Sequence, residues 1–143
     1  IAGGDSHSGG YYEEMCQKAD EDARTVRTGF VRGAEKDELF TNGALYVLPS
    51  DLEGMPISLL EAMSYGTPCL VSDIPENTQL LEKFGASFAH GDPAALAEAL
   101  NRALQAPPPA GEAQAEYIRQ NYSWEKNARD TLALYQRAAA RRR

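Results

Sequence analysis

The stretch Glu53-Gly-Met-Pro-Ile-Ser-Leu-Leu-Glu61-Ala-Met-Ser-Tyr-Gly66-Thr-Pro68 lies between two short apolar runs. Proline is tolerated in the first turn of a helix and glycine is favoured just after the last turn. The stretch therefore predicts a helix over residues 56–65 that ends at Gly66. The flanking runs, residues 44–48 and 69–72, are continuously apolar, as expected for parallel strands covered on both faces. Together they predict a strand–helix–strand unit.

The same alternation continues outward from this unit. Residues 1–4 are expected to be the end of a buried strand, followed by a polar loop over residues 5–10. Strands separated by single helices predict right-handed crossovers, and hence an α/β fold with a doubly wound parallel sheet. The further expected helices are 11–23, 35–41, 76–84 and 93–105, with Leu39 and Phe40 facing inward, and the further strands are 25–31 and 86–89.

The last third of the chain is expected to be helical. The proline-rich residues 106–111 could link two domains, but two amphipathic helices follow within residues 112–140 and no further strand does. We therefore interpret 106–111 as a stiff connector inside one domain. Asp92 and Ser123 are expected to cap helices. Leu96, Leu100 and Leu104 are expected to share one apolar helix face, and so are Trp124, Ala128, Leu132 and Tyr135.

Composition limits the classes of function. The 143 residues are enough for one domain with its own core, and the net charge of −7 argues against a general nucleic-acid surface. The basic residues 141–143 are interpreted as a cationic helix end. Cys16 and Cys69, like the two histidines, lack metal-ligand spacing, so no metal site is predicted, and Cys69 is expected in the core.

The start of the helix at residue 56 presents groups that suit an anion. The amides of Ile57 and Ser58 lack intrahelical partners and lie at the positive end of the helix, where they can receive a diphosphate. Gly54 lets a ligand approach the backbone closely. Glu53 and Glu61 can accept hydrogen bonds from sugar hydroxyls and from a ribose diol, because carboxylates accept without donating. A nucleotide sugar is a ligand with all of these groups.

Spacing alone leaves another interpretation open. Ser58, Glu61 and Tyr65 are three or four residues apart, so they also fit the solvated stripe of an amphipathic helix. Glu53 also fits an ordinary polar turn.

Further motifs follow in a fixed order: Thr28-Gly-Phe-Val31, Leu45-Tyr-Val-Leu-Pro-Ser50, Glu53-Gly and Glu61-Ala-Met, Gly66-Thr-Pro68, Val71-Ser-Asp73 and Tyr122-Ser-Trp124. In this order and spacing the chain resembles the retaining glycosyltransferases of the GT-B fold, specifically glycosyltransferase family 4. The resemblance implies that residues 1–143 form the Rossmann-like C-terminal domain that binds the nucleotide sugar. It also implies a truncated N-terminal edge, without the first strand–helix unit of this domain and without the acceptor domain.

The resemblance implies a role for each matching residue. Glu61 would hold the ribose, and Glu53 would contact the donor sugar near the reacting centre as the catalytic residue. The remaining substrate-binding residues would be Gly54, Met55, Pro56, Ile57 and Ser58 around the sugar and diphosphate, with the backbone of Phe30 and Val31 bordering the base.

The chain departs from the family pattern in two ways. Many relatives have Phe-Gly where this chain has Met55-Pro56, and the proline removes one amide donor from the cradle. The Arg and Lys with which the family neutralises the diphosphate lie on a segment that would precede Ile1. Arg32 and Lys36 are cations of this chain that could take their place.

The resemblance implies transfer of a sugar, without a metal ion or another cofactor, to an acceptor hydroxyl of a glycan, a lipid or a small molecule. The acceptor would bind the missing domain, so residues 1–143 alone are expected to be inactive. Two alternatives stay open: a nucleotide-sugar epimerase of the same fold, and a non-catalytic module that binds an anion or nucleotide. No signal peptide or membrane-spanning run is present, so a cytoplasmic location is expected, with peripheral membrane association left open.

Overall fold

The computed structural model describes residues 1–4 and 10–141. The chain divides into two compact units, residues 1–39 and residues 40–143, and each is described by itself. The expected loop at 5–10 and the basic run at 141–143 fall largely outside the described residues. Among the described residues, no helix has both the length and the apolar character needed to cross a membrane.

Unit 1 contains α1 (Gly10–Asp20) and most of α2 (Ala34–Asn42). The strand predicted over residues 25–31 is wrong, because the structure has a single parallel bridge there, between Ala2 and Gly29. Gly29 has a φ of +67°, which interrupts the extended backbone that a strand needs. The buried strand expected over residues 1–4 is also wrong, since Ile1 is 74% exposed.

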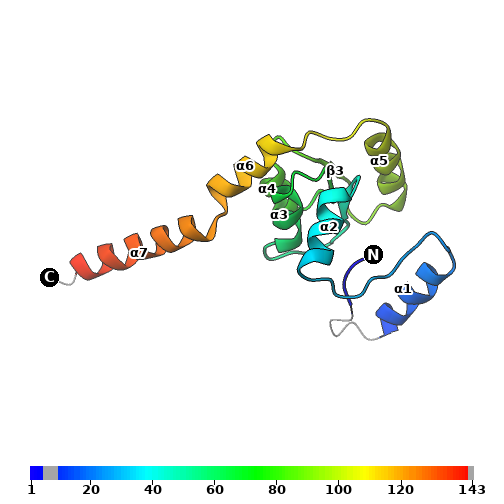
Figure 1. The fold of residues 1–143 in the computed structure, drawn as a ribbon, viewed down its shortest axis with the longest axis horizontal. Helices are drawn as coiled ribbons and strands as arrows, with labels where there is room; N and C mark the ends of the chain where they lie inside the picture. Colours follow the sequence, from blue (N-terminus) through cyan, green and yellow to red (C-terminus); the bar gives the residue numbers. More distant parts are fainter. Residues whose placement is uncertain (5–9, 142–143) are drawn as a thin grey trace. The chain divides into compact units, whose positions relative to one another are not determined.

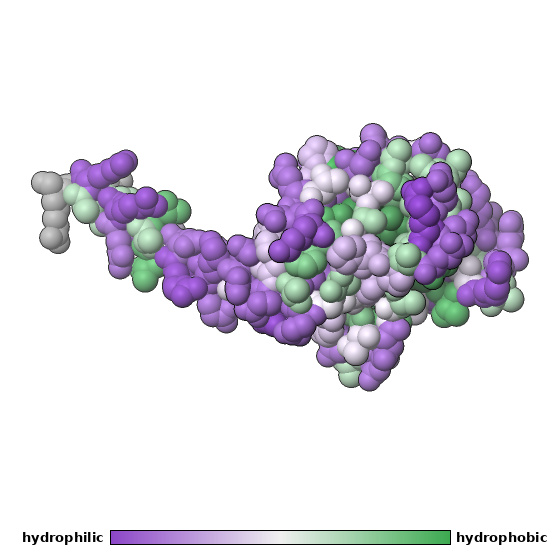
Figure 2. Space-filling view, turned by 90° about the horizontal axis from the view of Figure 1, so that it is seen from above, coloured by the Kyte–Doolittle hydropathy of each residue, from purple (hydrophilic) through white to green (hydrophobic). Residues whose placement is uncertain are grey.

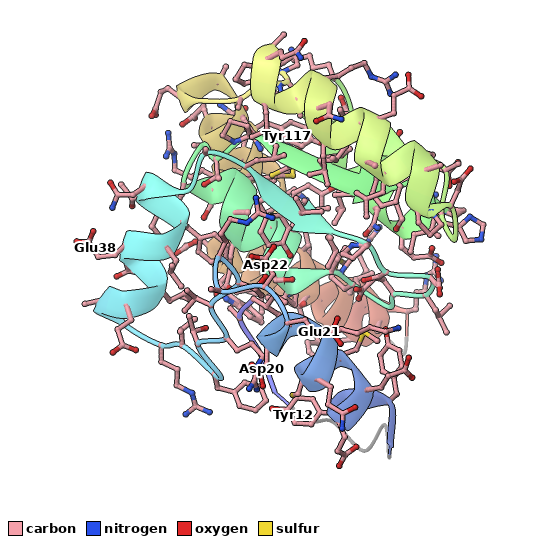
Figure 3. The ribbon with its side chains drawn as sticks, turned by 90° about the vertical axis from the view of Figure 1, so that its right-hand side faces the viewer. Tyr12, Asp20, Glu21, Asp22, Glu38 and Tyr117 are labelled. Atoms are coloured by element: carbon pink, nitrogen blue, oxygen red, sulfur yellow. The ribbon has the colours of Figure 1, made fainter. Side chains whose placement is uncertain are left out.

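Ion pairs hold the chain that follows α1. The helix ends at Asp20 rather than near residue 23, and Asp20 binds the guanidinium of Arg27 at 2.9 Å. Asp22 binds Arg24 in the same way at 2.6 Å. Figure 3 labels Asp20, the last residue of α1, and Asp22 in the turn that follows. These exposed pairs order the turn but contribute little to stability, because water screens them.

Unit 2 is built on a parallel sheet of strand order β1-β2-β3. The strands and their connecting helices alternate along the chain, as predicted: β1 (Tyr46–Leu48), α3 (Ile57–Ser64), β2 (Cys69–Ser72), α4 (Pro75–Leu81), β3 (Ala86–Phe88) and then α5 (Pro93–Gln105). Two helices, α6 (Glu112–Asn121) and α7 (Trp124–Ala140), complete the unit (Figure 1).

Helices cover both faces of this sheet, which confirms the doubly wound arrangement. All four residues of β2 are buried, and they alternate between the faces. Cys69 and Val71 pack in one cluster with side chains of α3, α4 and α6. Leu70 packs in another cluster, with Phe88 of β3 and with α5 through Ala99. In Figure 1, α3 and α6 accordingly lie side by side, and α5 lies apart from them.

The ends of α3 position the candidate site. At its C-terminal end, the amide of Gly66 donates to the carbonyl of Met63, and the amide of Thr67 donates to that of Ala62. Gly66 has a φ of +74°, so this end is a Schellman motif with glycine in the left-handed position. The prediction that Gly66 ends this helix is therefore confirmed, although the last helical residue is Ser64 rather than Tyr65.

The caps are confirmed, whereas some predicted helix faces are wrong. Asp92 accepts from the amides of Ala94 and Ala95, and Ser123 accepts from the amide of Lys126. On α5, however, Leu104 is 65% exposed and Ala103 is buried instead. On α2, Leu39 is likewise exposed, although Phe40 stacks on Tyr65 with ring centroids 5.5 Å apart.

Helix α7 keeps its apolar side chains exposed. Trp124 is 83% exposed, and Leu132 and Tyr135 are exposed as well. Figure 2 shows hydrophobic residues in green between hydrophilic ones along this helix. Helix α6 by contrast packs on the core through Ile118 and through Tyr117, which is labelled in Figure 3 and lies 5.8 Å from the Phe84 ring.

Candidate functional site

The candidate site begins where β1 ends and the chain turns toward α3. Glu53 lies in this loop, is half-buried, and accepts a 2.6 Å hydrogen bond from the Ser50 hydroxyl. The buried Pro56 is the N-cap of α3 and supplies no side-chain cap. The loop therefore holds one oxygen of Glu53 while leaving the helix start without an internal anion.

The start of α3 presents amides ahead of the first intrahelical bonds. Those bonds run from the amides of Leu59 and Leu60 to the carbonyl of Pro56, at 3.1 and 3.2 Å. The amides of Ile57 and Ser58 precede them, as predicted, although the helix begins at Ile57, one residue later than expected. Since the helix dipole adds positive potential at this point, the geometry suits a bound anion.

The helix start is open to solvent. Gly54, Met55, Ile57 and Ser58 are all exposed. A Cβ built on Gly54 would meet nothing within 4 Å, so a ligand can approach this backbone. Within the described part of the chain, the corner between β1 and α3 is thus an accessible surface.

Tyr46 of β1 contacts the start of α3. Its hydroxyl donates to the Ser58 hydroxyl at 2.7 Å. Burial raises the pKa of Tyr46, and the negative charges of Glu53 and Glu61 act in the same direction. The Tyr46 hydroxyl thus holds the Ser58 side chain in the first turn of α3.

Glu61 lies one turn along α3 from the helix start. It is half-buried, and it is four residues after Ile57, so the two share a face of the helix. The Ser64 hydroxyl donates to the carbonyl of Glu61 at 2.7 Å, which orders the backbone at this point. Glu61 is thus placed to meet a ligand that extends from the helix start along the same face.

Sequence reasoning missed Tyr46 as a site residue. A tyrosine within the apolar run of residues 45–48 was interpreted only as part of a strand. The available signal was its hydroxyl, since a buried tyrosine oxygen needs a hydrogen-bond partner. Only the structure identifies that partner as Ser58.

Phe30 and Val31 belong to unit 1 and are described there. Phe30 is 72% exposed, and Val31 lines a hollow of about 400 Å³ together with Thr28, Glu35, Glu38 and Leu39. The structure describes these residues apart from the loop and helix that carry Glu53 and Glu61. That their backbone borders the base of the nucleotide therefore stays a prediction.

Two other expectations concern cations. Arg32 is exposed and Lys36 is half-buried, both in unit 1. Across the described residues, the side chains of His, Cys, Asp and Glu form no group of three or more that could hold a metal ion. The groups that the site itself offers to an anion are backbone amides.

Comparison with known proteins assigns the chain to a family. The family model of the glycosyl transferases group 1 matches residues 1–124. The chain belongs to the glycosyl transferases group 1. This confirms the resemblance noted in the sequence, and it makes the corner between β1 and α3 part of a glycosyltransferase domain.

Curated relatives of this group 1 domain agree with that assignment. A glycosyltransferase of Methanocaldococcus jannaschii, MJ1607, is 29% identical over 135 residues, which are 87% of this chain and 33% of the relative. The alpha-maltose-1-phosphate synthase of Mycolicibacterium smegmatis is 33% identical over 114 residues, 72% of this chain and 30% of the relative. The chain thus spans about a third of the length of these relatives.

The fold has a solved counterpart. Sucrose-phosphate synthase from Thermosynechococcus elongatus superposes with a TM-score of 0.84 at 23% sequence identity, over 97% of this chain and 38% of that chain. The likeness shows the Rossmann-like architecture of a GT-B domain, as the alternation of strands and helices predicted.

Proposed function

We propose that this chain is the donor-binding C-terminal half of a retaining glycosyltransferase of family 4. The protein would transfer a sugar from a nucleoside-diphosphate sugar to an acceptor hydroxyl. One observation carries the proposal: Glu53 and Glu61 flank the exposed start of α3, where the amides of residues 57 and 58 precede the first intrahelical hydrogen bonds. The family membership gives this geometry its chemical meaning.

The donor would bind along α3. The amides of Ile57 and Ser58 receive the diphosphate, with the backbone of Gly54 and Met55 close to the sugar. Glu61 accepts from the two ribose hydroxyls, because its two oxygens match a pair of adjacent donors. In unit 1, the backbone of Phe30 and Val31 borders the base.

The chemistry needs charge stabilisation where the bond breaks. As the bond between the sugar and the diphosphate breaks, negative charge grows on the leaving group, and fixed amides at a helix start stabilise it without reorganisation. Glu53, held by Ser50 on one oxygen, keeps its other oxygen for the donor sugar. Our proposal includes no resident metal ion or cofactor.

The acceptor is left to the part of the protein outside this chain. The matched relatives are about three times as long as the matched region, which leaves room for an acceptor domain. A glycan, a lipid or a small molecule are the candidate acceptors, and peripheral membrane association would accompany a lipid.

The proposal can be tested with the protein's complete natural chain. Thermal shift against a panel of nucleotide sugars should identify the donor, and UDP-galactose belongs in the panel because an Escherichia coli relative, 53% identical over 38 residues, is named for its use of UDP-Gal. The product of the transfer should keep the anomeric configuration of the donor, as measured by NMR.

Two results would contradict the proposal. Interconversion of the nucleotide sugar without an acceptor would indicate an epimerase. Binding of nucleoside diphosphates with no dependence on the ribose hydroxyls, and without turnover, would indicate a non-catalytic module.

A further inference from the structure

A chain of hydrogen bonds leads from the interior of unit 2 to Glu53. It begins at Asn77 in the first turn of α4, whose side chain is fully buried. The amide nitrogen of Asn77 donates to the Ser72 hydroxyl at 3.0 Å and to the Ser72 carbonyl at 3.3 Å. The Ser72 hydroxyl donates to the carbonyl of Ser50. The Ser50 hydroxyl then donates to Glu53.

The direction of every bond in this chain is determined. A carbonyl oxygen can only accept, so the group of Asn77 that faces the Ser72 carbonyl must be its NH₂. The Ser72 hydroxyl has one proton, which it gives to Ser50, and its oxygen therefore accepts from Asn77. Each hydrogen bond is thus donated in the same direction, from α4 through β2 to the loop after β1.

These hydrogen bonds connect three elements at one edge of the sheet. Ser72 is the last residue of β2, Asn77 follows it in α4, and Ser50 follows β1. These are the carboxyl ends of neighbouring parallel strands, where open α/β sheets bind their ligands. Because Asn77 and Ser72 are fully buried, the hydrogen bonds between them are electrostatically stronger than they would be in water.

The side chain of Asn77 is energetically costly to bury at this position. Among the described residues, its side-chain oxygen is buried without a hydrogen-bond partner. An apolar side chain of similar volume would fill the space without that unpaired oxygen. The nitrogen of the same side chain, by contrast, holds the Ser72 hydroxyl.

We propose that Asn77 is a positioning residue for Glu53, acting through Ser72 and Ser50. It fixes the backbone of the loop after β1 and thereby the direction of the Glu53 carboxylate. The inference rests on the proposed function, in which Glu53 contacts the donor sugar. It adds a role for three residues that do not themselves touch the donor.

The test compares two buried amides in the protein's complete natural chain. Asn77→Leu removes the amide and keeps the number and branching of the side-chain heavy atoms. Gln114→Met is the matched control, since Gln114 is also fully buried with an unpartnered oxygen, but its nitrogen donates to the carbonyl of Thr67, at the opposite end of β2. Both variants lose one buried amide, and only one of them loses the link to Glu53.

Steady-state kinetics should separate the two variants. Asn77→Leu should lower kcat about ten- to a hundredfold, the size expected when a contact at the reacting centre is misplaced. The donor KM should stay within about twofold, because the amides and carboxylate of α3 are untouched. Gln114→Met should keep the kcat of the unmodified protein at a temperature where both variants are folded.

A second pair of variants tests the hydrogen bond from Ser50 to Glu53. Ser50→Ala should lower kcat as Asn77→Leu does, whereas Ser50→Thr keeps a hydroxyl and should keep most of the activity. The double variant Asn77→Leu/Ser50→Ala should be no worse than Ser50→Ala alone, since both changes break one chain. If Asn77→Leu does not fold, Asn77→Ala, which adds no bulk, takes its place.

The outcomes distinguish this inference from the proposed function. If Asn77→Leu lowers the melting temperature as Gln114→Met does but leaves kcat unchanged, Asn77 is only structural and the inference is wrong. If the unmodified protein transfers no sugar, the proposed function fails. Crystal structures of the variants then decide: the inference expects loss of the Ser50–Glu53 contact in Asn77→Leu, and an unchanged contact overturns it.

Discussion

At the scale of single residues, the site combines fixed and accessible groups. Ser50 holds one oxygen of Glu53, and the Tyr46 hydroxyl is held by Ser58. The helix start between them is exposed. Fixed side chains beside an open surface are what a binding site needs, because little entropy remains to be lost when a ligand arrives.

Glu61→Ala should weaken binding of the nucleotide to the complete protein by about 1–3 kcal/mol, the cost of losing a charged hydrogen-bond partner. Calorimetric titration measures the loss. Glu98→Ala is the control, because Glu98 is an exposed carboxylate on α5 that pairs with Arg102. Equal affinities of Glu61→Ala and the unmodified protein would show that Glu61 is only a solvated side chain.

Glu53→Gln should depress turnover more than it depresses donor affinity. The substitution keeps the size of the side chain and removes its charge, so an interaction that matters mainly in the transition state is lost while ground-state contacts persist. Steady-state kinetics with the identified donor give both parameters. Intact kcat with a raised KM would remove the proposed role of Glu53 at the reacting centre.

Cys69 should resist thiol reagents in the folded protein. Burial raises the pKa of this thiol to about 12, so the reactive thiolate is scarce at pH 8. Because the unfolded thiol loses its proton near pH 9, stability should fall as pH rises from about 9 toward 12, by up to about 1.4 kcal/mol per pH unit.

Peptide mapping after alkylation, with and without urea, checks the reactivity of Cys69. The pH dependence is checked by comparing urea unfolding of the protein with that of Cys69→Ala, which lacks the titrating group. Rapid labelling of Cys69 without urea would contradict its burial.

At the scale of elements, α3 links the site to the core of unit 2. One face of the helix packs Leu59 and Met63 on the sheet, while its first residues stay exposed to a ligand. Its C-terminal end is held by Gly66, whose carbonyl accepts from the amide of Gly111 at 3.0 Å. The position of α3, and with it that of the amides at its start, therefore depends on a contact with the segment before α6.

Gly66→Ala should lower the free energy of unfolding by about 1–3 kcal/mol, the cost of a strained backbone position. The added Cβ would lie in the left-handed region, at φ +74°, and 3.0 Å from two backbone atoms of Gly111. Gly91→Ala is the matched control, since Gly91 has a φ of +70° and nothing within 4 Å of such a Cβ.

Urea unfolding measures both variants. The difference between them isolates the clash with Gly111 from the strain of the positive φ. Equal losses would show that the contact between Gly66 and Gly111 adjusts without cost.

At the scale of the whole molecule, this chain covers about a third of its curated relatives. The group 1 model matches residues 1–124, and thus includes parts of both units. In the proposed reaction the donor binds here and the acceptor binds the remaining length of the protein. Catalysis then depends on both parts together.

A polypeptide limited to residues 1–143 should show no sugar transfer, while the protein's complete natural chain should. A radiolabelled-donor assay on both, at equal concentrations, measures the difference. Circular dichroism of the short polypeptide shows whether it is folded under the assay conditions. Transfer by the folded short polypeptide would contradict the proposed division between donor and acceptor parts.

Local patterns account for the elements that sequence predicted well. The bounds of β2 and α5 were predicted to the residue, and the caps Asp92 and Ser123 were predicted with them. Apolar runs, proline and capping side chains act within a few residues of themselves, so they can be recognised without the fold.

Other predictions failed because they depended on partners. Residues 25–31 have a strand-like composition, but a strand exists only where a neighbour pairs with it, and the structure provides one bridge. Leu104 continued the apolar period of α5, yet the structure exposes Leu104 and buries Ala103 instead. Burial of a side chain depends on the packing angle of its helix, which the period does not determine.

The sequence by itself determined the alternation of strands and helices, the amides at the start of α3, and the two acids on either side of them. Only the tertiary structure decided that the Tyr46 hydroxyl donates to Ser58, and that Asn77 reaches Glu53 through Ser72 and Ser50. The reason is physical: propensities and caps act along the chain, whereas hydrogen bonds between side chains depend on how the strand ends meet in space.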